Sequence, residues 1–317
     1  MERWIVKVIT FDDILNLPID SKTVYDWVKT SFKHKPETHL PPKISMSNEG
    51  IFINVMPCIL YNEGVAGVKI VSRYPERTPT LNSEILLYDY DTGALKAIMD
   101  GNYVTALRTG AVAALCVETL AVQDYSVIGI MGFGNVMRKT LDILFDVMEK
   151  RPLEVKIFSY KDHFEELKRR YKGHDHINFV EVDNYEDVVR NSDVVISAIT
   201  RAEGDFCSND CFKKGCLVVP IHTLGFQNCD LFFDKFVVDD IGHVKGFKYF
   251  DRFKQVTELT DVLLGKRPGR VDDDERILAY CIGVAIHDIF FINRIYGMLA
   301  DKAREIDLNQ PIEKYWA

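Results

Sequence analysis

The sequence has no excess of positive charge. Its 317 residues include 39 lysines and arginines against 47 aspartates and glutamates, for a formal net charge of −8 at pH 7. Proteins that bind nucleic acids usually carry a basic field that attracts phosphates. The acidic balance therefore argues against a nucleic-acid partner and leaves room only for a local basic pocket that takes a small phosphate-bearing ligand.

Long apolar runs are missing as well. We find no run that approaches the roughly 18–20 residues needed to span a bilayer. The first residues alternate in polarity and lack the apolar segment of a signal peptide. We therefore expect a cytoplasmic protein without a membrane partner, and the length predicts roughly two domains.

Closely spaced cysteine pairs are also absent. The seven cysteines are an odd number, and no two of them are separated by only two residues. Cys207, Cys211 and Cys216 match no common spacing of zinc ligands. We expect reduced, buried thiols and no metal site.

The segments that are present follow two patterns. In the first hundred residues, strands are predicted over 51–55, 67–71 and 84–90, and the last of these forms a hairpin with 94–99. A helix rich in alanine and leucine follows over 102–120. This part of the chain is therefore predicted to be α+β.

From residue 125 onward, short apolar strands alternate with helices. This order is typical of βαβ units and a parallel sheet, in which the carboxyl ends of the strands share one edge where ligands bind. A mostly apolar stretch over 276–302 predicts a long closing helix that returns to the first domain. The strands are predicted over 126–131, 154–159, 177–182, 194–198, 217–221 and 236–239.

A glycine-rich turn follows the first of these strands and opens a helix. Gly132 permits the tight turn, Gly134 lets backbone N–H groups approach a pyrophosphate, and Asn135 and Val136 begin the helix, whose N-terminus favours anions. Met137 stands where a third small residue is usual. The pattern predicts a dinucleotide-binding loop, and a strand–turn–helix without a ligand is the alternative.

The tip of the second strand bears on which dinucleotide binds. Ser159, Tyr160 and Lys161 lie there, where NAD-dependent enzymes usually carry an acidic residue for the ribose 2′-hydroxyl. Lys161 suits a 2′-phosphate, which favours NADP, whereas Asp162 can still reach the ribose of NAD. Lys161 can also be a solvated loop lysine.

Several segments resemble those of the ornithine cyclodeaminase/μ-crystallin family over about residues 40 to 300, and they occur along the chain in the same order as in that family. The most specific is Thr105–Ala111, which is close to the family's TALRTAA signature. The other segments are GVKIVS at 67–72, LLYDYDTG at 86–93, the DVV at 193–195 with AIT at 198–200, GR at 269–270 and GVAIHD at 283–288.

This resemblance implies a fold and a class of activity. The fold would be α/β, with a doubly wound Rossmann domain over 118–289 and an α+β substrate-binding and dimerisation domain built from residues 1–117 and 290–317. The cofactor would be NADP or NAD, the oligomer a homodimer, and the substrate a small amino or imino acid. Family members include amino-acid dehydrogenases, ketimine reductases and cyclodeaminases that release ammonia, so the site must decide the reaction.

Two cations are the main candidates for substrate binding and catalysis. A guanidinium donates two parallel N–H bonds to a carboxylate, and the resemblance assigns this role to Arg108; a structural salt bridge is the alternative. Lys69 lies in an apolar strand and points away from Val68 and Ile70. The resemblance places Lys69 at the substrate, where a lysine of lowered pKa moves a proton. An outward-facing strand lysine is the alternative.

The resemblance assigns further residues to binding. Thr80 would lie near the substrate carboxylate, and Thr109 and Thr200 would face the cofactor. At the family's early carboxylate-binding arginine this chain has Lys43, which keeps the charge but loses the two-pronged donor.

The segment after the fifth strand departs from the cyclodeaminases, which carry a catalytic aspartate there. This chain has Gln227 instead, and no carboxylate follows until Asp230. His222 is a candidate for the proton transfer, with a core histidine bonded to the backbone as the alternative. We therefore expect hydride transfer at a C–N carbon, and we keep an ammonia lyase and a dinucleotide-binding protein with little turnover as alternatives.

Overall fold

The computed structural model describes residues 5–158, 160–199, 202–222 and 224–308, and these form two units. Unit 1 takes the described residues up to Ile19, then Thr30–Arg108 and those from Val284 on. Unit 2 takes Asp20–Lys29 and Thr109–Gly283. The sequence placed the boundaries at 117/118 and 289/290. One helix runs without a break through both 108/109 and 117/118, so local sequence carries no signal of where the first unit ends.

Unit 1 is a curved sheet with its order β16-β1-β7-β6-β5-β4-β2, and β3 pairs with β4. The pairing is antiparallel except between β1 and β7. Its strands are β1 (Ile5–Ile9), β2 (Thr38–His39), β3 (Ile44–Asn48), β4 (Ile51–Leu60), β5 (Val65–Arg73), β6 (Leu81–Asp89), β7 (Leu95–Asp100) and β16 (Arg304–Asp307). Its helices are α1 (Phe11–Leu15), α9 (Ala285–Leu299) and the short η1 (Lys35–Glu37) and η2 (Tyr61–Glu63), while α2 (Ser21–His34) and α3 (Asn102–Leu120) have residues in both units.

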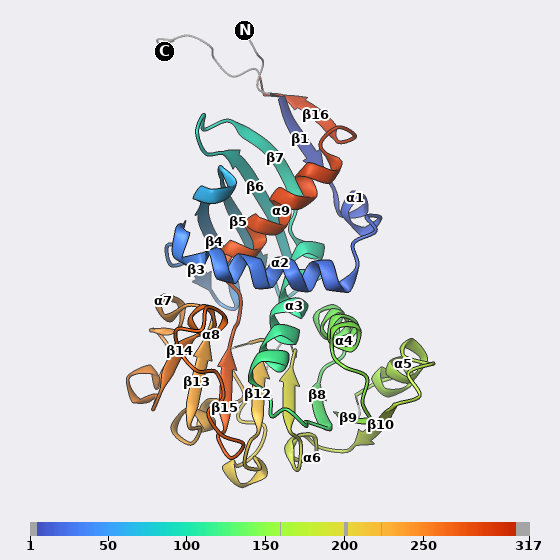
Figure 1. Cartoon of the computed structure of the whole chain (residues 1–317). Helices are drawn as coiled ribbons and strands as arrows, with labels where there is room; N and C mark the ends of the chain where they lie inside the picture. Colours follow the sequence, from blue (N-terminus) through green and yellow to red (C-terminus); the bar gives the residue numbers. More distant parts are fainter. Residues whose placement is uncertain (1–4, 159, 200–201, 223, 309–317) are drawn as a thin grey trace. The chain divides into compact units, whose positions relative to one another are not determined.

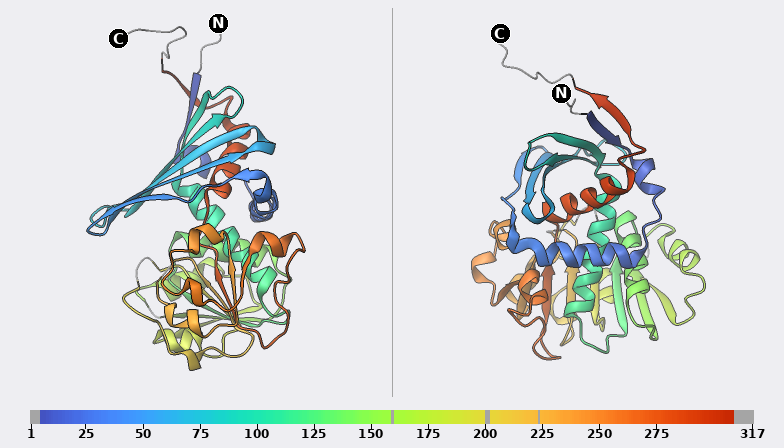
Figure 2. Two further views of the ribbon diagram at one scale, coloured as in Figure 1. Left: turned by 90° about the vertical axis from the view of Figure 1, so that its left-hand side faces the viewer. Right: turned by 45° about the horizontal axis from the view of Figure 1, so that its top comes forward.

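The sheet of unit 1 curves around α9, as Figures 1 and 2 show. This helix packs on β4, β5 and β6. A glycine in β5 makes the close approach feasible, because a Cβ at Gly67 would lie 2.4 Å from Cδ1 of Ile289. The first glycine of the GVKIVS segment therefore sets the distance between α9 and the strand that carries Lys69.

Unit 2 is a parallel sheet with helices on both faces (Figures 1 and 2). Its order is β10-β9-β8-β11-β12-β15-β13-β14, so the strand order reverses between β8 and β11, where doubly wound sheets bind ligands. The strands are β8 (Val127–Met131), β9 (Leu153–Phe158), β10 (Ile177–Val182), β11 (Val194–Ser197), β12 (Leu217–Pro220), β13 (Lys235–Val238), β14 (Val256–Glu258) and β15 (Ile277–Tyr280). The helices are α4 (Asn135–Val147), α5 (His163–Arg170), α6 (Tyr185–Val189), α7 (Ile241–Val244) and α8 (Leu259–Leu263), with η3 (Asn209–Cys211), η4 (Gln227–Leu231) and η5 (Phe250–Arg252).

The six strands predicted for this part are present within one residue of their expected ends. The long closing helix predicted over 276–302 is wrong at its start, because Ile277–Tyr280 form β15 and the helix begins only at Ala285. A strand of four apolar residues has no periodicity that separates it from a buried helix.

One helix of the described residues is long and apolar enough to cross a membrane by length and composition alone. It is α3, and 78% of its apolar window is buried inside the protein, which is typical of a core helix. This corrects the expectation that no run approaches that length, since the interruptions by Arg108 and Glu118 do not lower its mean hydropathy enough.

Candidate functional site

Lys69 is buried in unit 1 and joins a hydrogen-bonded cluster. Its side chain is 1% exposed, so the outward-facing alternative is wrong. Its Nζ donates to Oγ1 of Thr105 at 2.6 Å and to Oδ1 of Asp288 at 2.9 Å. Three elements therefore meet here: β5 supplies the lysine, α3 the threonine and α9 the aspartate.

Arg108 reaches the same carboxylate from α3, three residues beyond Thr105. Its Nε donates to Oδ1 of Asp288 at 3.0 Å, and both side chains are nearly inaccessible to solvent. The salt bridge that the sequence left as an alternative for Arg108 is thus present. One carboxylate oxygen binds two cations, and the three side chains together carry one positive charge in excess.

Burial and neighbouring charges shift the pKa values of Lys69, Asp288 and the adjacent His287. Burial lowers the pKa of Lys69 to about 8, and the Asp288 charge opposes this effect while the Arg108 charge adds to it. Burial alone would raise the pKa of Asp288, but Arg108 and Lys69 hold it below its usual value. Burial and the Arg108 charge lower the pKa of the neighbouring His287 to about 3. At neutral pH we therefore expect a charged Lys69, an ionised Asp288 and a neutral His287.

The cluster also contains polar atoms without partners. Six buried side-chain nitrogen or oxygen atoms of the described residues have no hydrogen-bond partner, and three of them are Nη1 of Arg108, Nε2 of His287 and Oδ2 of Asp288. Buried polar groups are nearly always hydrogen bonded, so these unpaired atoms leave hydrogen-bonding capacity in the cluster that a bound molecule could use.

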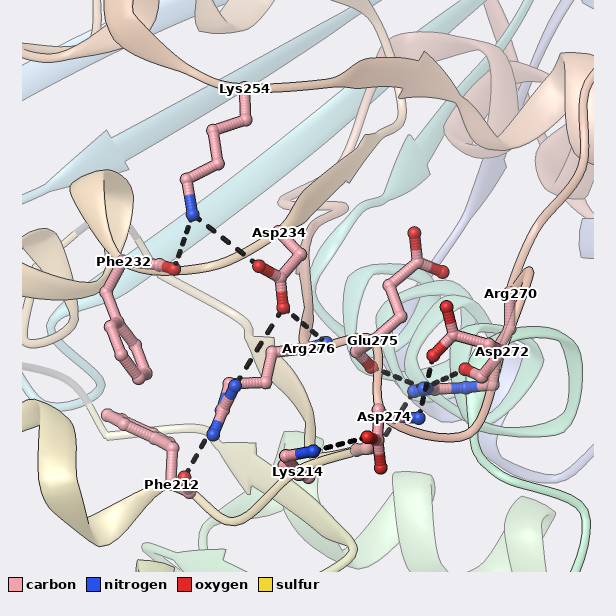
Figure 3. Close-up of polar contacts among 11 residues, drawn as sticks. Phe212, Lys214, Phe232, Asp234, Lys254, Arg270, Asp272, Asp274, Glu275 and Arg276 are labelled. Atoms are coloured by element: carbon pink, nitrogen blue, oxygen red, sulfur yellow. Dashed lines mark hydrogen bonds and ion pairs between the residues drawn. The ribbon is translucent and has the colours of Figure 1, made fainter.

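A second buried ion pair, in unit 2, is saturated. Lys235 donates to both Glu275 oxygens, at 2.9 and 3.1 Å, and to the Gly269 carbonyl, while Glu275 also accepts the Val271 N–H. Arg270 of the GR segment lies in the same region, which Figure 3 shows. It donates to the backbone carbonyls of Leu120, Gly215, Asp272 and Glu275. These groups hydrogen-bond to one another and to the backbone, and so stabilise the loop before β15.

The loop after β8 in unit 2 fits a dinucleotide diphosphate. Gly132 has a φ of +80°, and a Cβ there would lie 3.2 Å from the Ala198 carbonyl oxygen. Gly134 is exposed, and a Cβ there would meet no atom within 4 Å. Gly134 is the N-cap of α4 and has no side chain, so it does not itself cap the first amides of α4, those of Asn135 and Val136. Met137 is buried in the core.

The tip of β9 presents an aromatic ring and a cation. Tyr160 is 50% exposed, and Nζ of Lys161 lies 5.2 Å from the centre of its ring. Lys161 adopts a φ of +54° and is itself exposed. Ser159 and Thr200, which the resemblance and the strand ends indicated as cofactor residues, lie outside the described residues. A dinucleotide bound at Gly134 would find an accessible lysine at this end of the sheet.

Unit 2 also contains a cavity of about 650 Å³, lined in part by Asp205, Gln227 and Asp230. Asp230 is 1% exposed and accepts a hydrogen bond from the Tyr280 hydroxyl at 2.8 Å. Burial raises the pKa of Asp230 to about 6, against the lowering effect of that hydrogen bond. A carboxylate that the sequence analysis set aside as too far along the chain thus lines the same cavity as Gln227.

His222 is held in place by its neighbours. Its Nε2 lies 2.6 Å from Oγ of Ser197, and a further hydrogen bond joins it to the Leu224 backbone. Burial lowers its pKa. This geometry matches the core histidine that the sequence kept as the alternative, and the catalytic role of His222 stays a prediction.

The remaining predicted residues occupy various positions. Lys43 is exposed in the segment before β3, and Thr80 is partly buried just before β6, with its carbonyl accepting the Tyr74 N–H. Thr109 is buried in α3. Among the described residues no group of three or more histidine, cysteine or acidic side chains is arranged to hold a metal ion.

A profile of the ornithine cyclodeaminase/mu-crystallin family matches residues 12–303. An N-((2S)-2-amino-2-carboxyethyl)-L-glutamate dehydrogenase of Staphylococcus aureus is 28% identical over 270 residues, which cover 77% of this chain and 78% of that protein.

Solved structures of two other enzymes share the fold. The Delta(1)-pyrroline-2-carboxylate reductase of Thermococcus litoralis, in complex with NADH and L-proline, has a TM-score of 0.81 at 24% identity and covers 96% of this chain and 100% of that one. An archaeal alanine dehydrogenase dimer with bound NAD has a TM-score of 0.81 at 23% identity, with coverages of 96% and 99%. These likenesses confirm the predicted α/β fold class.

The sequence did not identify Asp288 or Asp230 as candidate site residues, although Asp288 joins the buried cluster and Asp230 lines the cavity of unit 2. Asp288 appeared only as the last letter of the GVAIHD segment, and nothing near it in the sequence indicated its partners. Those partners lie 219 and 180 residues away, at Lys69 and Arg108.

Proposed function

This chain belongs to the ornithine cyclodeaminase/mu-crystallin family, and on that premise we propose that it is a nicotinamide-dinucleotide-dependent oxidoreductase that transfers hydride to or from the C–N carbon of a small amino or imino acid. The observation that carries this proposal is the buried cluster of Lys69, Arg108 and Asp288 with its excess positive charge and unpaired Nη1. A substrate carboxylate would balance that charge and accept that N–H. Relatives named as dehydrogenases and as pyrroline-carboxylate reductases support the same class of reaction.

Arg108 and Lys69 have different roles in the proposed reaction. Arg108 binds the substrate carboxylate and so orients the reacting carbon. Lys69 holds or moves the proton at the substrate nitrogen, and its pKa of about 8 suits a general acid near neutral pH. When bound, the dinucleotide supplies the hydride in the direction of reduction. In that direction Lys69 gives its proton to the nitrogen and regains one from water, so no covalent intermediate with the enzyme is needed.

Unit 2 is the proposed dinucleotide-binding unit, with the diphosphate at Gly132, Gly134 and the start of α4. We favour NADP over NAD, because the accessible Lys161 provides a positive charge for a 2′-phosphate. At the position of Lys161, the chain thus has a cation and not an acidic residue that would bind the ribose 2′-hydroxyl of NAD.

We also propose that the protein is a cytoplasmic homodimer that pairs through unit 1. Ile44 and Met46 of β3 are 61% and 53% exposed, and in register they pair with Val55 and Ile53 of β4. These four apolar side chains share one face of the β3–β4 hairpin, as alternate residues of paired strands do. A second copy of the chain would cover this face, and the alanine dehydrogenase of the same fold is a dimer.

A second candidate function is an ammonia lyase of the ornithine cyclodeaminase type, in which bound dinucleotide is regenerated within each turnover. Asp230 favours it, because a buried carboxyl with a pKa of about 6 that lines a cavity can act as the acid or base that Gln227 cannot provide.

The test is a screen of the purified protein with cyclic imines, keto acids with ammonium or amines, and amino acids, each with NADPH, NADH or their oxidised forms. We expect a net change in absorbance at 340 nm with at least one substrate. Arg108→Ala should raise KM roughly 10- to 100-fold, as expected for the loss of a hydrogen-bonded ion pair, with dinucleotide binding retained.

Three outcomes would contradict this function in different ways. An unchanged KM in Arg108→Ala would remove Arg108 from the substrate. Ammonia release without net change at 340 nm would select the lyase. Dinucleotide binding without turnover of any substrate would select a binding protein.

A further inference from the structure

We propose that Asp288 is a positioning residue that holds Lys69 and Arg108 in one fixed arrangement and controls the protonation of Lys69. This inference rests on the proposed function for its kinetic consequences, but its structural part can be tested without turnover.

The geometry makes Asp288 the common point of the cluster. Its Oδ1 accepts from Nζ of Lys69 at 2.9 Å and from Nε of Arg108 at 3.0 Å, and the carboxylate is fully buried. A guanidinium and an ammonium that both bind one oxygen cannot move independently. The carboxylate therefore fixes the separation between the proposed substrate clamp and the proposed proton donor.

The contrast with Glu275 separates this role from that of a structural counter-ion. Both oxygens of Glu275 are occupied, by Lys235 and the Val271 N–H. Asp288 binds two cations with one oxygen, and its Oδ2 has no partner among the described residues. A counter-ion that served stability alone would be expected to use both oxygens.

Other groups around Lys69 do not replace Asp288 as its counter-ion. In β4 and β6 the residues opposite Lys69 are the apolar Met56 and Ile85. Cys58 of β4 stays a neutral thiol, because burial raises its pKa to about 12. Asp100 of β7 contributes a weaker attraction than Asp288, and its oxygens bind Asn102 and the Tyr103 N–H.

On α3 and α9 the remaining titratable neighbours are Arg108 and His287. Arg108 is a cation that disfavours the charged form of Lys69, and His287 is neutral at the pH values of interest because its pKa is lowered to about 3. Asp288 is thus the principal anion that keeps Lys69 protonated. Its removal should lower the pKa of Lys69, and removal of Arg108 should raise it.

The decisive experiment follows the titration of Lys69 by NMR in protein labelled at lysine Cε, with the Lys69 signal assigned through Lys69→Met. In Asp288→Asn we expect the titration to shift to lower pH by about 1–3 units, and in Arg108→Gln to higher pH. Glu275→Gln removes the matched buried carboxylate of unit 2 and should leave the Lys69 titration where it is. An unchanged Lys69 titration in folded Asp288→Asn would overturn the proposal.

Kinetics supply a second readout if the protein turns over a substrate. The alkaline limb of kcat/KM for imine reduction, which reports on the free enzyme, should move to lower pH in Asp288→Asn and stay in place in Glu275→Gln.

If Asp288→Asn does not fold, the variant Asp288→Glu tests the positioning role instead. It should keep the Lys69 titration close to that of the wild type while kcat/KM falls at least tenfold, and wild-type kcat/KM in Asp288→Glu would contradict the positioning role. Absence of any turnover would count against the proposed function, whereas the NMR titration would still test the role of Asp288.

Discussion

At the scale of single residues, the accessible side chain of Lys161 bears on whether the protein prefers NADP or NAD. It lies at the tip of β9 with a positive φ and faces the ring of Tyr160, so its ammonium is displayed at the end of the strand. An exposed cation contributes little to the stability of the fold. Its value lies in what it can bind, and a 2′-phosphate carries nearly two negative charges that an ordinary ribose lacks.

We predict that the wild-type protein binds NADPH more tightly than NADH and that Lys161→Ala weakens NADPH binding about tenfold, as expected for the loss of an exposed charged hydrogen bond. Binding of NADH should change little. Fluorescence titration with both dinucleotides measures this. Lys172→Ala, which removes an exposed lysine just after the other end of α5, is the matched control. Tighter binding of NADH by the wild type would contradict the prediction.

At the scale of elements, the turn from β8 into α4 contains two glycines, and the physical reason for a glycine differs between the two positions. Gly132 needs its left-handed backbone and has the Ala198 carbonyl 3.2 Å from where a Cβ would lie. Gly134 has an ordinary extended backbone and open space around it. Folding therefore requires the first glycine, and only a ligand would require the second.

Alanine at each position tests this difference. Gly132→Ala should lower the free energy of unfolding by about 1–3 kcal/mol, because of backbone strain and close contact. Gly134→Ala should cost less than about 1 kcal/mol, the usual effect at an N-cap, yet weaken dinucleotide binding at least tenfold, because the methyl group stands where the diphosphate approaches. Chemical denaturation and dinucleotide titration measure the two quantities. Unchanged dinucleotide binding in Gly134→Ala would show that the diphosphate does not lie on this turn.

At the scale of the whole molecule, each unit has its own core, and the exposed apolar face of the β3–β4 hairpin belongs to unit 1. Several neighbouring exposed apolar residues on one hairpin are unusual on a monomer and mark a surface for association. The β3–β4 hairpin thus predicts how copies of the chain meet.

We predict a solution mass twice the 36.4 kDa of one chain, measured by light scattering coupled to size-exclusion chromatography. Met46→Glu places a charge in the apolar face and should shift the protein towards the monomer. Val271→Glu adds the same charge at an exposed apolar residue of unit 2 and should leave the dimer intact. A monomeric wild type, or a dimer unaffected by Met46→Glu, would contradict pairing through this face.

The sequence predicted those features whose causes are local. Six of the eight strands of unit 2 and the turn at Gly132 follow from patterns within a few residues, whereas the burial of Lys69 does not, because its strand neighbours Val68 and Ile70 left an outward-facing lysine open. The predicted start of the closing helix is wrong. Ile277–Tyr280 are apolar at every position, and their strand conformation depends on pairing with β12 and β13. The resemblance to a family supplied Arg108 as a substrate residue but gave no partner for it.

By itself, the sequence determined the alternation of strands and helices and the glycine turn between β8 and α4, since each depends on neighbouring residues. Only the tertiary structure decided that Lys69, Arg108 and Asp288 form one buried cluster, because the chain brings them together across separations of up to 219 residues. The pKa of Lys69 is likewise a property of the folded state. It depends on how much water is excluded and on which charges the distant segments place beside the amine.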